Sequence, residues 1–181
     1  VLLGIYIMFI DKTDKETILK PLQVVIGIVE RKQALPILSN VLIEKEPGNI
    51  RFTATDLEIQ ITTSIEGKAG DGETSAITVG GKKIQEILRI LPDQSKISIE
   101  AKENKAQIKS AKSRFSLQTL PAQDFPKLSN QLAGAKKITL GQSALKKLLL
   151  SVQYAMAQQD VRYYLNGVLL IVEGNKLKVV A

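Results

Sequence analysis

Asp56 and Glu58 are the first residues whose types and spacing could do chemistry. They lie two positions apart, so on a continuous strand both carboxylates would face the same side. Such a pair could hold Mg²⁺ for phosphoryl chemistry. The alternative is a polar turn in which Asp56 caps nearby backbone amides. We favour the turn, because no third acid or base stands close in the sequence to complete a site.

A second candidate is Gly80-Gly81-Lys82-Lys83, which comes before a predicted helix and looks superficially like a phosphate-binding loop. A P-loop has its first glycine four residues earlier and a serine or threonine after its lysine. Here Ile84 follows Lys83. The sequence therefore predicts a simple entry into a helix.

The amino-acid composition excludes several classes of chemical site. The 181 residues include no histidine and no cysteine, which excludes disulfides, Cys- or His-ligated structural zinc, and Ser–His or Cys–His nucleophiles. We expect no metal, no cofactor and no catalytic site, hence a protein that is not an enzyme. Four Phe, four Tyr and no Trp argue against a platform for base stacking. The missing cysteines are compatible with the cytoplasm, where we expect the protein to act.

The basic residues point to a polyanionic partner. The net charge is +7, and cations recur on the polar sides of predicted helices, where acids are few. Solvated helix faces are often rich in lysine, so charge alone leaves an ordinary surface as the alternative. Residues of this type would contact phosphates without sequence preference. On the helices they are Lys15, Lys20, Lys82, Lys83, Arg89, Lys146 and Lys147, with Arg31 and Lys32 on the link after the first helix.

Two helices and a series of strands must position these residues. A capping box, Thr13 to Glu16, opens a helix that continues to Val29 with Pro21 inside it. Apolar residues at i, i+3, i+4 and i+7 predict a second helix over 82–91. Between and after them, the sequence predicts strands over 35–46, 50–55, 58–65, 75–79, 96–101, 105–110 and 113–120. This order predicts an α+β fold with antiparallel sheets.

The domain organisation follows from composition and from an internal repeat. Residues 1–10 are apolar but too short to span a membrane, and Met8 is a candidate start that would leave 1–7 as an upstream leader. We expect a first domain over 8–120, a Pro- and Gly-containing linker over 121–137 and a truncated second domain over 138–181.

The repeat relates the starts of these two domains. Leu19 matches Leu145 and Asn40 matches Asn166 at an offset of 126, and Ile50 matches Leu177 at 127. Several segments in order at nearly one offset indicate a duplicated domain.

Four motifs carry a resemblance to a known family. They are Ala34-Leu-Pro-Ile-Leu-Ser-Asn40, Thr53-Ala-Thr-Asp-Leu-Glu-Ile59, Ser113-Arg-Phe-Ser-Leu-Gln-Thr-Leu-Pro121 and Gln159-Asp-Val-Arg-Tyr-Tyr-Leu-Asn-Gly167. Together with the repeat, they closely resemble the β subunits of bacterial DNA polymerase III, the sliding clamps, from about Met8 to Ala181. The resemblance implies a DNA-clamp fold, with antiparallel sheets outside and two helices per domain lining a ring of two protomers.

Residues of this sequence that match the family's motifs are expected to have the roles known in that family. The resemblance implies DNA contacts at Lys32 and Gln159, and Arg31, Lys83 and Lys146 are further candidates. It implies part of a cleft for the peptide tails of polymerase and clamp-loader subunits at Arg162, Tyr164 and Leu165. It implies a protomer interface at Phe115 and Leu117, although these side chains could equally fill the domain's own core.

The expected function is a clamp that encircles duplex DNA and tethers the replicative polymerase for processive synthesis, as a homodimer when full length and without a membrane partner. The alternative is a basic α+β domain that binds nucleic acid without encircling it. An enzyme built on Asp56 and Glu58 is a distant third hypothesis.

Overall fold

The structure is a computed structural model that describes residues 7–29, 35–66, 74–102, 104–128 and 137–181. The chain divides into two compact units, Val1–Asn130 and Gln131–Ala181. The first unit carries two four-stranded antiparallel sheets and two helices, so the expected α+β class is confirmed. In the described part of the chain, no helix has both the length and the apolar character needed to cross a lipid bilayer.

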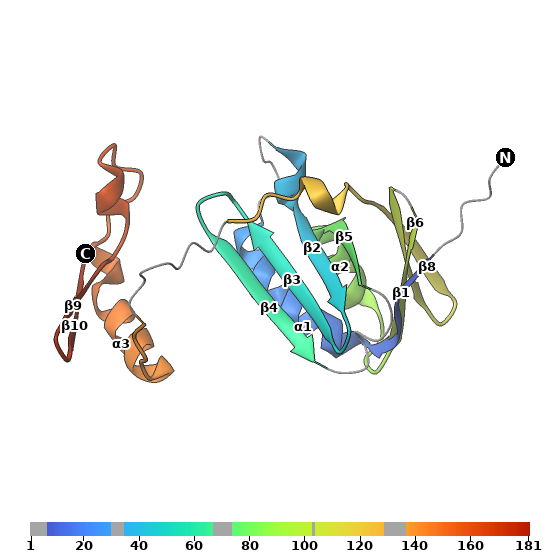
Figure 1. The fold of residues 1–181 in the computed structure, drawn as a ribbon, viewed down its shortest axis with the longest axis horizontal. Coiled ribbons are helices and arrows are strands. Elements are labelled where there is room, and N and C mark those ends of the chain that lie inside the picture. The colour runs from blue at the N-terminus through green and yellow to red at the C-terminus, as the bar shows by residue number, and fades with distance from the viewer. Residues whose placement is uncertain (1–6, 30–34, 67–73, 103, 129–136) are drawn as a thin grey trace. The chain divides into compact units, whose positions relative to one another are not determined.

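One sheet of the first unit has the order β1 (Ile7–Asp14), β6 (Lys96–Lys102), β7 (Lys105–Ser110) and β8 (Ser113–Gln118). The other has the order β4 (Gln60–Glu66), β3 (Asn49–Thr55), β2 (Asn40–Glu46) and β5 (Ser75–Gly80). The helices α1 (Lys15–Val25) and α2 (Gly81–Ile90) pack side by side on one face of the second sheet (Figure 1).

The core of the first unit follows from the two periodicities in its sequence. Helical spacing turns one face of each helix inward, and strand alternation turns every second residue of the sheets toward the same core. Phe52 on β3 and Leu88 on α2 are completely buried. The other fully buried large side chains in this cluster are Ile10, Ile18, Leu22, Ile43, Ile50, Ile84, Ile97, Ile99 and Ile108.

Two local predictions about the start of the first unit are wrong. The strand predicted from Leu35 begins only at Asn40, because Pro36–Ser39 form a 3-10 helix, η2. Pro36 lacks an amide hydrogen and fixes φ, which suits the first turn of such a helix. The capping box does not form either. β1 continues to Asp14, and the Thr13 hydroxyl donates to the Asp11 carbonyl at 3.2 Å.

Lys15 is also not the solvated residue that its sequence position suggested. Its side chain is only 5% exposed, and its Nζ donates to the carbonyl of Leu91 at 3.1 Å and to Asp93 Oδ1 at 2.8 Å. Leu91 directly follows α2. Lys15 therefore fastens the first residue of α1 to the end of α2, and it cannot contact DNA without leaving that position.

Lys15→Met is expected to lower the free energy of unfolding by about 1–3 kcal/mol, because it leaves the buried Leu91 carbonyl without its donor. Lys20→Met is the matched control on the same helix, since Lys20 is exposed, and it should change stability by less than about 0.5 kcal/mol. Urea denaturation measures both. Equal effects of the two substitutions would contradict the role of Lys15.

The same contact makes stability depend on pH. The hydrogen bond from Lys15 and its positive charge lower the pKa of Asp93 below its ordinary value. A carboxyl whose pKa is lowered by folding adds stability above its unfolded pKa and loses it as the pH falls through the folded value. Below about pH 4 the wild type should therefore lose part of its advantage over Lys15→Met.

Residues beyond β8 form a strap across the first unit. The Thr78 hydroxyl of β5 donates to the Leu120 carbonyl at 2.7 Å and accepts from its amide at 2.9 Å. Phe125 is 5% exposed, and Leu128 N donates to Gln60 Oε1 on β4 at 2.9 Å. Lys127 pairs with Glu44 of β2. The first unit thus continues past residue 120, into the segment predicted to be a linker.

The second unit repeats the start of the first. It contains α3 (Gln142–Val152), the 3-10 helices η5 (Gln153–Ala155) and η6 (Tyr163–Asn166), and the hairpin β9 (Leu169–Glu173) and β10 (Lys176–Val180). The same elements in the first unit are α1, η1 (Ile26–Ile28), η2, β2 and β3. The duplication is therefore structural.

The structural offset between the copies is 127 throughout. α1 and α3 are both eleven residues long and begin at 15 and 142, and η2 and η6 begin at 36 and 163. The offset of 126 inferred for the helix and for Asn40 is wrong by one residue. Leu145 corresponds to Ile18, and Asn166 corresponds to Ser39. Runs of adjacent apolar residues, such as Ile18-Leu19 and Leu148-Leu149-Leu150, tolerate such a slip in a sequence comparison.

The second unit lacks a closed core. None of its described residues is buried, and Leu170 and Val172 on β9 are about half exposed. Several of those that are partly buried fall at positions of core residues in the first unit, such as Leu149 at the position of Leu22 and Val179 at that of Phe52. Within the described part of the second unit, the exposed face of β9 is therefore not covered by a packed layer. That the unit is a truncated domain stays a prediction.

Candidate nucleic-acid interface

The exposed face of α2 carries more positive than negative charge, with Lys83 and Arg89 on either side of Glu86. Ile84 and Leu88 point into the core, which turns Lys83 and Arg89 to solvent. Neither cation forms an ion pair with any residue that the structure describes. Exposed cations such as these two can make exchangeable contacts with phosphate groups.

Close packing explains why a glycine stands at position 81, directly before Lys82 and Lys83. β5 ends at Gly80 and α2 begins at Gly81, without the loop that a phosphate cradle requires. A Cβ on Gly81 would lie 2.9 Å from Cγ2 of Val41 and 3.5 Å from both Cγ atoms of Val29. The glycine allows close packing of helix against sheet, which agrees with the predicted simple entry into a helix.

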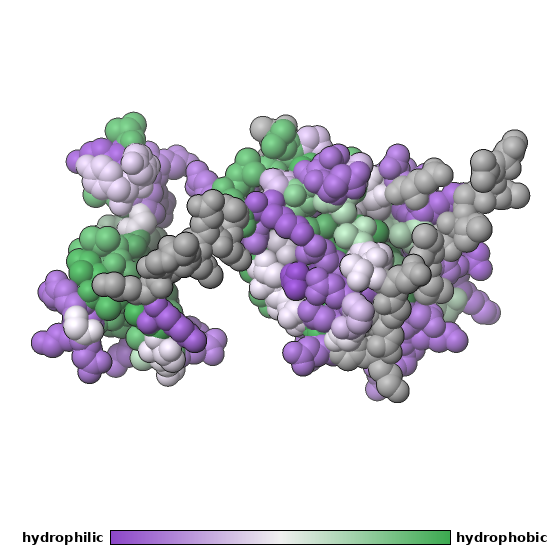
Figure 2. Space-filling view, in the orientation of Figure 1, coloured by the Kyte–Doolittle hydropathy of each residue, from purple (hydrophilic) through white to green (hydrophobic). Residues whose placement is uncertain are grey.

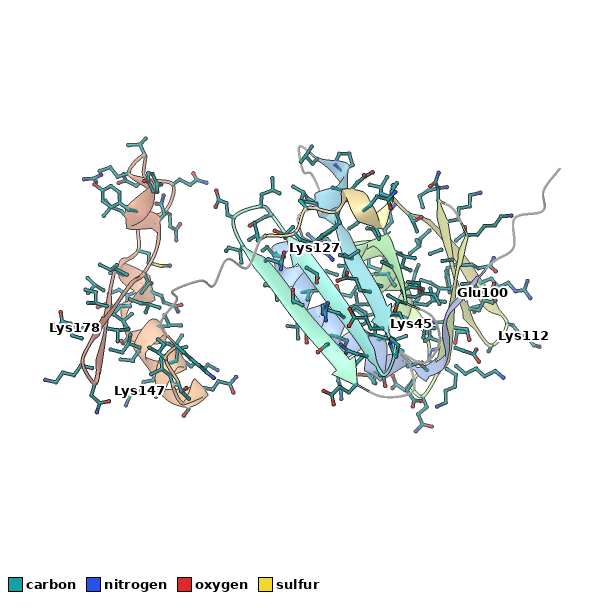
Figure 3. All side chains as sticks on the ribbon, in the orientation of Figure 1. Lys45, Glu100, Lys112, Lys127, Lys147 and Lys178 are labelled. Atoms are coloured by element: carbon teal, nitrogen blue, oxygen red, sulfur yellow. The ribbon has the colours of Figure 1, made fainter. Side chains whose placement is uncertain are left out.

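The first helix of each unit also presents a lysine. Lys20 on α1 is exposed, and at the offset of 127 its counterpart on α3 is Lys147, which is exposed as well (Figure 3). Lys146 is exposed too, but it stands at the position of Leu19, which is buried in the first unit. By this correspondence Lys147, not Lys146, is the counterpart of Lys20, and both exposed lysines stay candidate contacts.

The links after these helices are the third candidate contact. The predicted residues Arg31 and Lys32 lie outside the described part of the chain. Gln159, at 127 positions from Lys32, is exposed and has φ +60°. This left-handed backbone is unfavourable for a residue with a Cβ, and such strain is often found at functional sites.

The pair Asp56 and Glu58 forms a turn. Asp56 Oδ1 accepts hydrogen bonds from the amides of Glu58 at 2.9 Å and Ile59 at 2.7 Å, so the predicted capping role is confirmed. Among the described residues, no group of three or more acidic side chains could hold a metal ion. The turn offers no arrangement for phosphoryl chemistry.

The segment 160–166 is held by its own hydrogen bonds. Asp160 Oδ1 accepts from the amide and Nε of Arg162 at 2.8 and 3.1 Å, and Oδ2 accepts from the guanidinium at 3.0 Å. Asn166 closes the loop with two 3.0 Å bonds to the backbone of Asp160. The contacts with Arg162 lower the pKa of the Asp160 carboxyl, and those with Asp160 raise the pKa of Arg162. Arg162 is thus occupied in shaping the loop.

This loop displays aromatic side chains. Tyr163 and Tyr164 are 83% and 68% exposed, with ring centroids 5.9 Å apart in an edge-to-face arrangement. Leu165 is half-buried, and its carbonyl accepts from the Ala157 amide at 2.9 Å. Exposed aromatic residues on an ordered segment are typical of protein-binding sites.

Phe115 and Leu117 lie on the inner side of β8. Both are partly buried and pack against the core of the first unit, which is the alternative that the sequence left open. β8 is nevertheless the last strand of its sheet. Within the described part of the chain, its outer backbone edge has no strand partner, so a protomer contact would use that edge.

Comparisons with known proteins identify the family. Residues 9–129 match the model of the N-terminal domain of the DNA polymerase III beta subunit, and residues 139–181 match that of its central domain. The first match alone covers more than half of the chain. The protein belongs to the DNA polymerase III beta subunit family.

Similarity to individual relatives supports this family assignment. The chain is 46% identical over 169 residues to the beta sliding clamp of Pseudomonas aeruginosa, covering 92% of the chain and 45% of the relative. It is 40% identical over 168 residues to that of Escherichia coli K12, with 93% and 45% covered. A crystal structure of the Pseudomonas aeruginosa beta subunit matches with a TM-score of 0.87 at 40% identity, over 97% of this chain and 46% of that one. The chain spans about half the length of these relatives.

Proposed function

We propose that the chain forms the first domain and the beginning of the second in a sliding clamp, which encircles duplex DNA and tethers the replicative polymerase. The observation that carries this proposal is the duplicated helix–hairpin unit, whose two copies match consecutive domains of one family. A ring can be built by repeating such a unit, and the free cations of α2 offer phosphate contacts weak enough for sliding.

The proposed clamp needs no catalytic group of its own, since topology holds it on DNA while the polymerase does the chemistry. We propose that it acts in the cytoplasm as a homodimer, with the free edge of β8 near Phe115 and Leu117 as the protomer contact. The loop with Tyr164 and Leu165 would supply part of a cleft for peptide tails of the polymerase and clamp loader, with Arg162 positioning that loop.

Retention on DNA tests this proposal. In a chimera, the chain replaces the matching region of the Pseudomonas aeruginosa relative, whose own remainder completes the protein. Loaded by the relative's clamp loader, the chimera should stay on closed circular DNA through gel filtration and leave once the circle is cut. Equal retention on circular and linear DNA would favour the alternative, a basic domain that binds without encircling.

Lys83→Ala in this chimera is expected to reduce the slope of log affinity against log salt by about one unit, as the loss of one phosphate contact requires. Gln159→Ala should weaken binding and leave the slope nearly unchanged, because glutamine carries no charge. Lys127→Ala is the matched control, since Lys127 already pairs with Glu44. Fluorescence anisotropy over a salt series measures all three. An unchanged slope in Lys83→Ala would remove Lys83 from the interface.

A further inference from the structure

The outward face of the sheet β1-β6-β7-β8 is strongly basic. Ile99, Ile108 and Phe115 turn toward the core, so strand alternation turns Lys109 and Arg114 outward. Figure 2 shows hydrophilic residues over much of this side of the first unit, and Figure 3 shows Glu100 and Lys112 on this sheet. The basic sheet face comprises Lys102, Lys105, Lys109, Lys112 and Arg114.

The register places like charges opposite each other. Lys102 on β6 lies directly opposite Lys105 on β7, and Lys109 on β7 lies directly opposite Arg114 on β8. Side chains in such positions have Cβ atoms about 4.5–5.5 Å apart, and like charges there destabilise a sheet. Glu100 offsets part of the repulsion at Lys109. Cations placed opposite each other depart from the usual cross-strand pairing, and departures of this kind are expected at functional surfaces.

Three of the five cations of the basic sheet face form no ion pair with any described residue. Its acids are Glu100 on β6, which pairs with Lys109, and Asp11 and Asp14 on β1 at the far edge of the sheet. Asp14 pairs with Lys96, and Asp11 accepts a hydrogen bond from Ser98. Lys105, Lys112 and Arg114 are exposed and form no ion pair with any described residue. A cationic surface of this density attracts an anionic polymer.

The same face lacks the apolar and aromatic side chains by which acidic proteins and single-stranded nucleic acids are usually bound. None of the exposed large hydrophobic side chains belongs to β6, β7 or β8, so the face offers no apolar anchor for a protein partner. It also presents no exposed aromatic ring on which single-stranded bases could stack. Phosphate contacts to a duplex require neither feature.

We propose that the basic sheet face binds the phosphate backbone of duplex DNA without reading its bases. It points away from the core on its own sheet and is separate from the exposed face of α2, so it would hold DNA outside the proposed ring. The proposal is independent of the encircling function, because it predicts binding by the chain itself.

The test is a duplex oligonucleotide titrated against the 181-residue chain by fluorescence anisotropy over a salt series. Lys105→Glu with Arg114→Glu should lower affinity about ten-fold or more at low salt and reduce the salt slope by about two units. The stability of this variant should hold or rise, because Arg114→Glu replaces a like-charge pair with an opposite-charge pair beside Lys109. Lys176→Glu with Lys178→Glu changes net charge equally on β10 and should have a much smaller effect.

Equal losses in the two double variants would overturn the proposal, since net charge alone would then explain the binding. So would undiminished affinity in the sheet-face variant, or poly-glutamate peptide competing as well as duplex DNA at equal charge. If the double Glu variant fails to fold, Lys105→Gln with Arg114→Gln applies the same criterion with a slope change of the same sign.

Discussion

Leu88→Ala is expected to lower the free energy of unfolding of the chain by about 2–5 kcal/mol, since it removes a completely buried side chain and leaves a cavity. Leu88 lies on the inner face of α2, against the sheet that also receives α1. A loss of this size is a large fraction of the stability of an ordinary domain. Urea denaturation followed by circular dichroism measures it.

Ile90→Ala is the control for this substitution. Ile90 lies two residues further along the same helix but is 73% exposed, so its truncation should change stability by less than about 0.5 kcal/mol. Comparable losses from the two variants would mean that Leu88 does not occupy the core position described here.

The second large effect concerns peptide binding. The chain alone is expected to bind a hydrophobic, acidic polymerase-tail peptide at least about 100-fold more weakly than the chimera. The proposed part of the cleft lies on a unit whose described residues are not buried, so it is poorly preorganised. Calorimetry with one peptide against both proteins measures the ratio. Equal affinities would place the whole site within residues 1–181.

Two substitutions in the chimera locate this site. Tyr164→Ala should weaken the peptide by removing an exposed aromatic side chain that can make contact. Asp160→Ala should weaken it indirectly, by releasing Arg162, while the two Asn166 bonds to the backbone of residue 160 remain possible. Lys178→Ala, on the neighbouring hairpin, is a control that should leave peptide affinity unchanged.

The sequence by itself determined most element types, the α+β class and the duplication, and its motifs led to the family. It missed the 3-10 helix Pro36–Ser39. Regular apolar spacing over α2 and alternation over β3, β6 and β7 predict these elements within one or two residues, because each buries a single face. The turn at Asp56 was also predictable, since its hydrogen bonds are local.

Only the tertiary structure decided which lysine side chains are buried and which residues they lie against. Lys15 and Lys20 look alike in the sequence, yet one is buried against the end of α2 and the other faces solvent. The register that pairs Lys147 with Lys20, and the opposition of Lys109 and Arg114, depend on elements far apart or on strand pairing. Local patterns specify which face of an element is buried, whereas the partner of a charged side chain is set by which elements pack together.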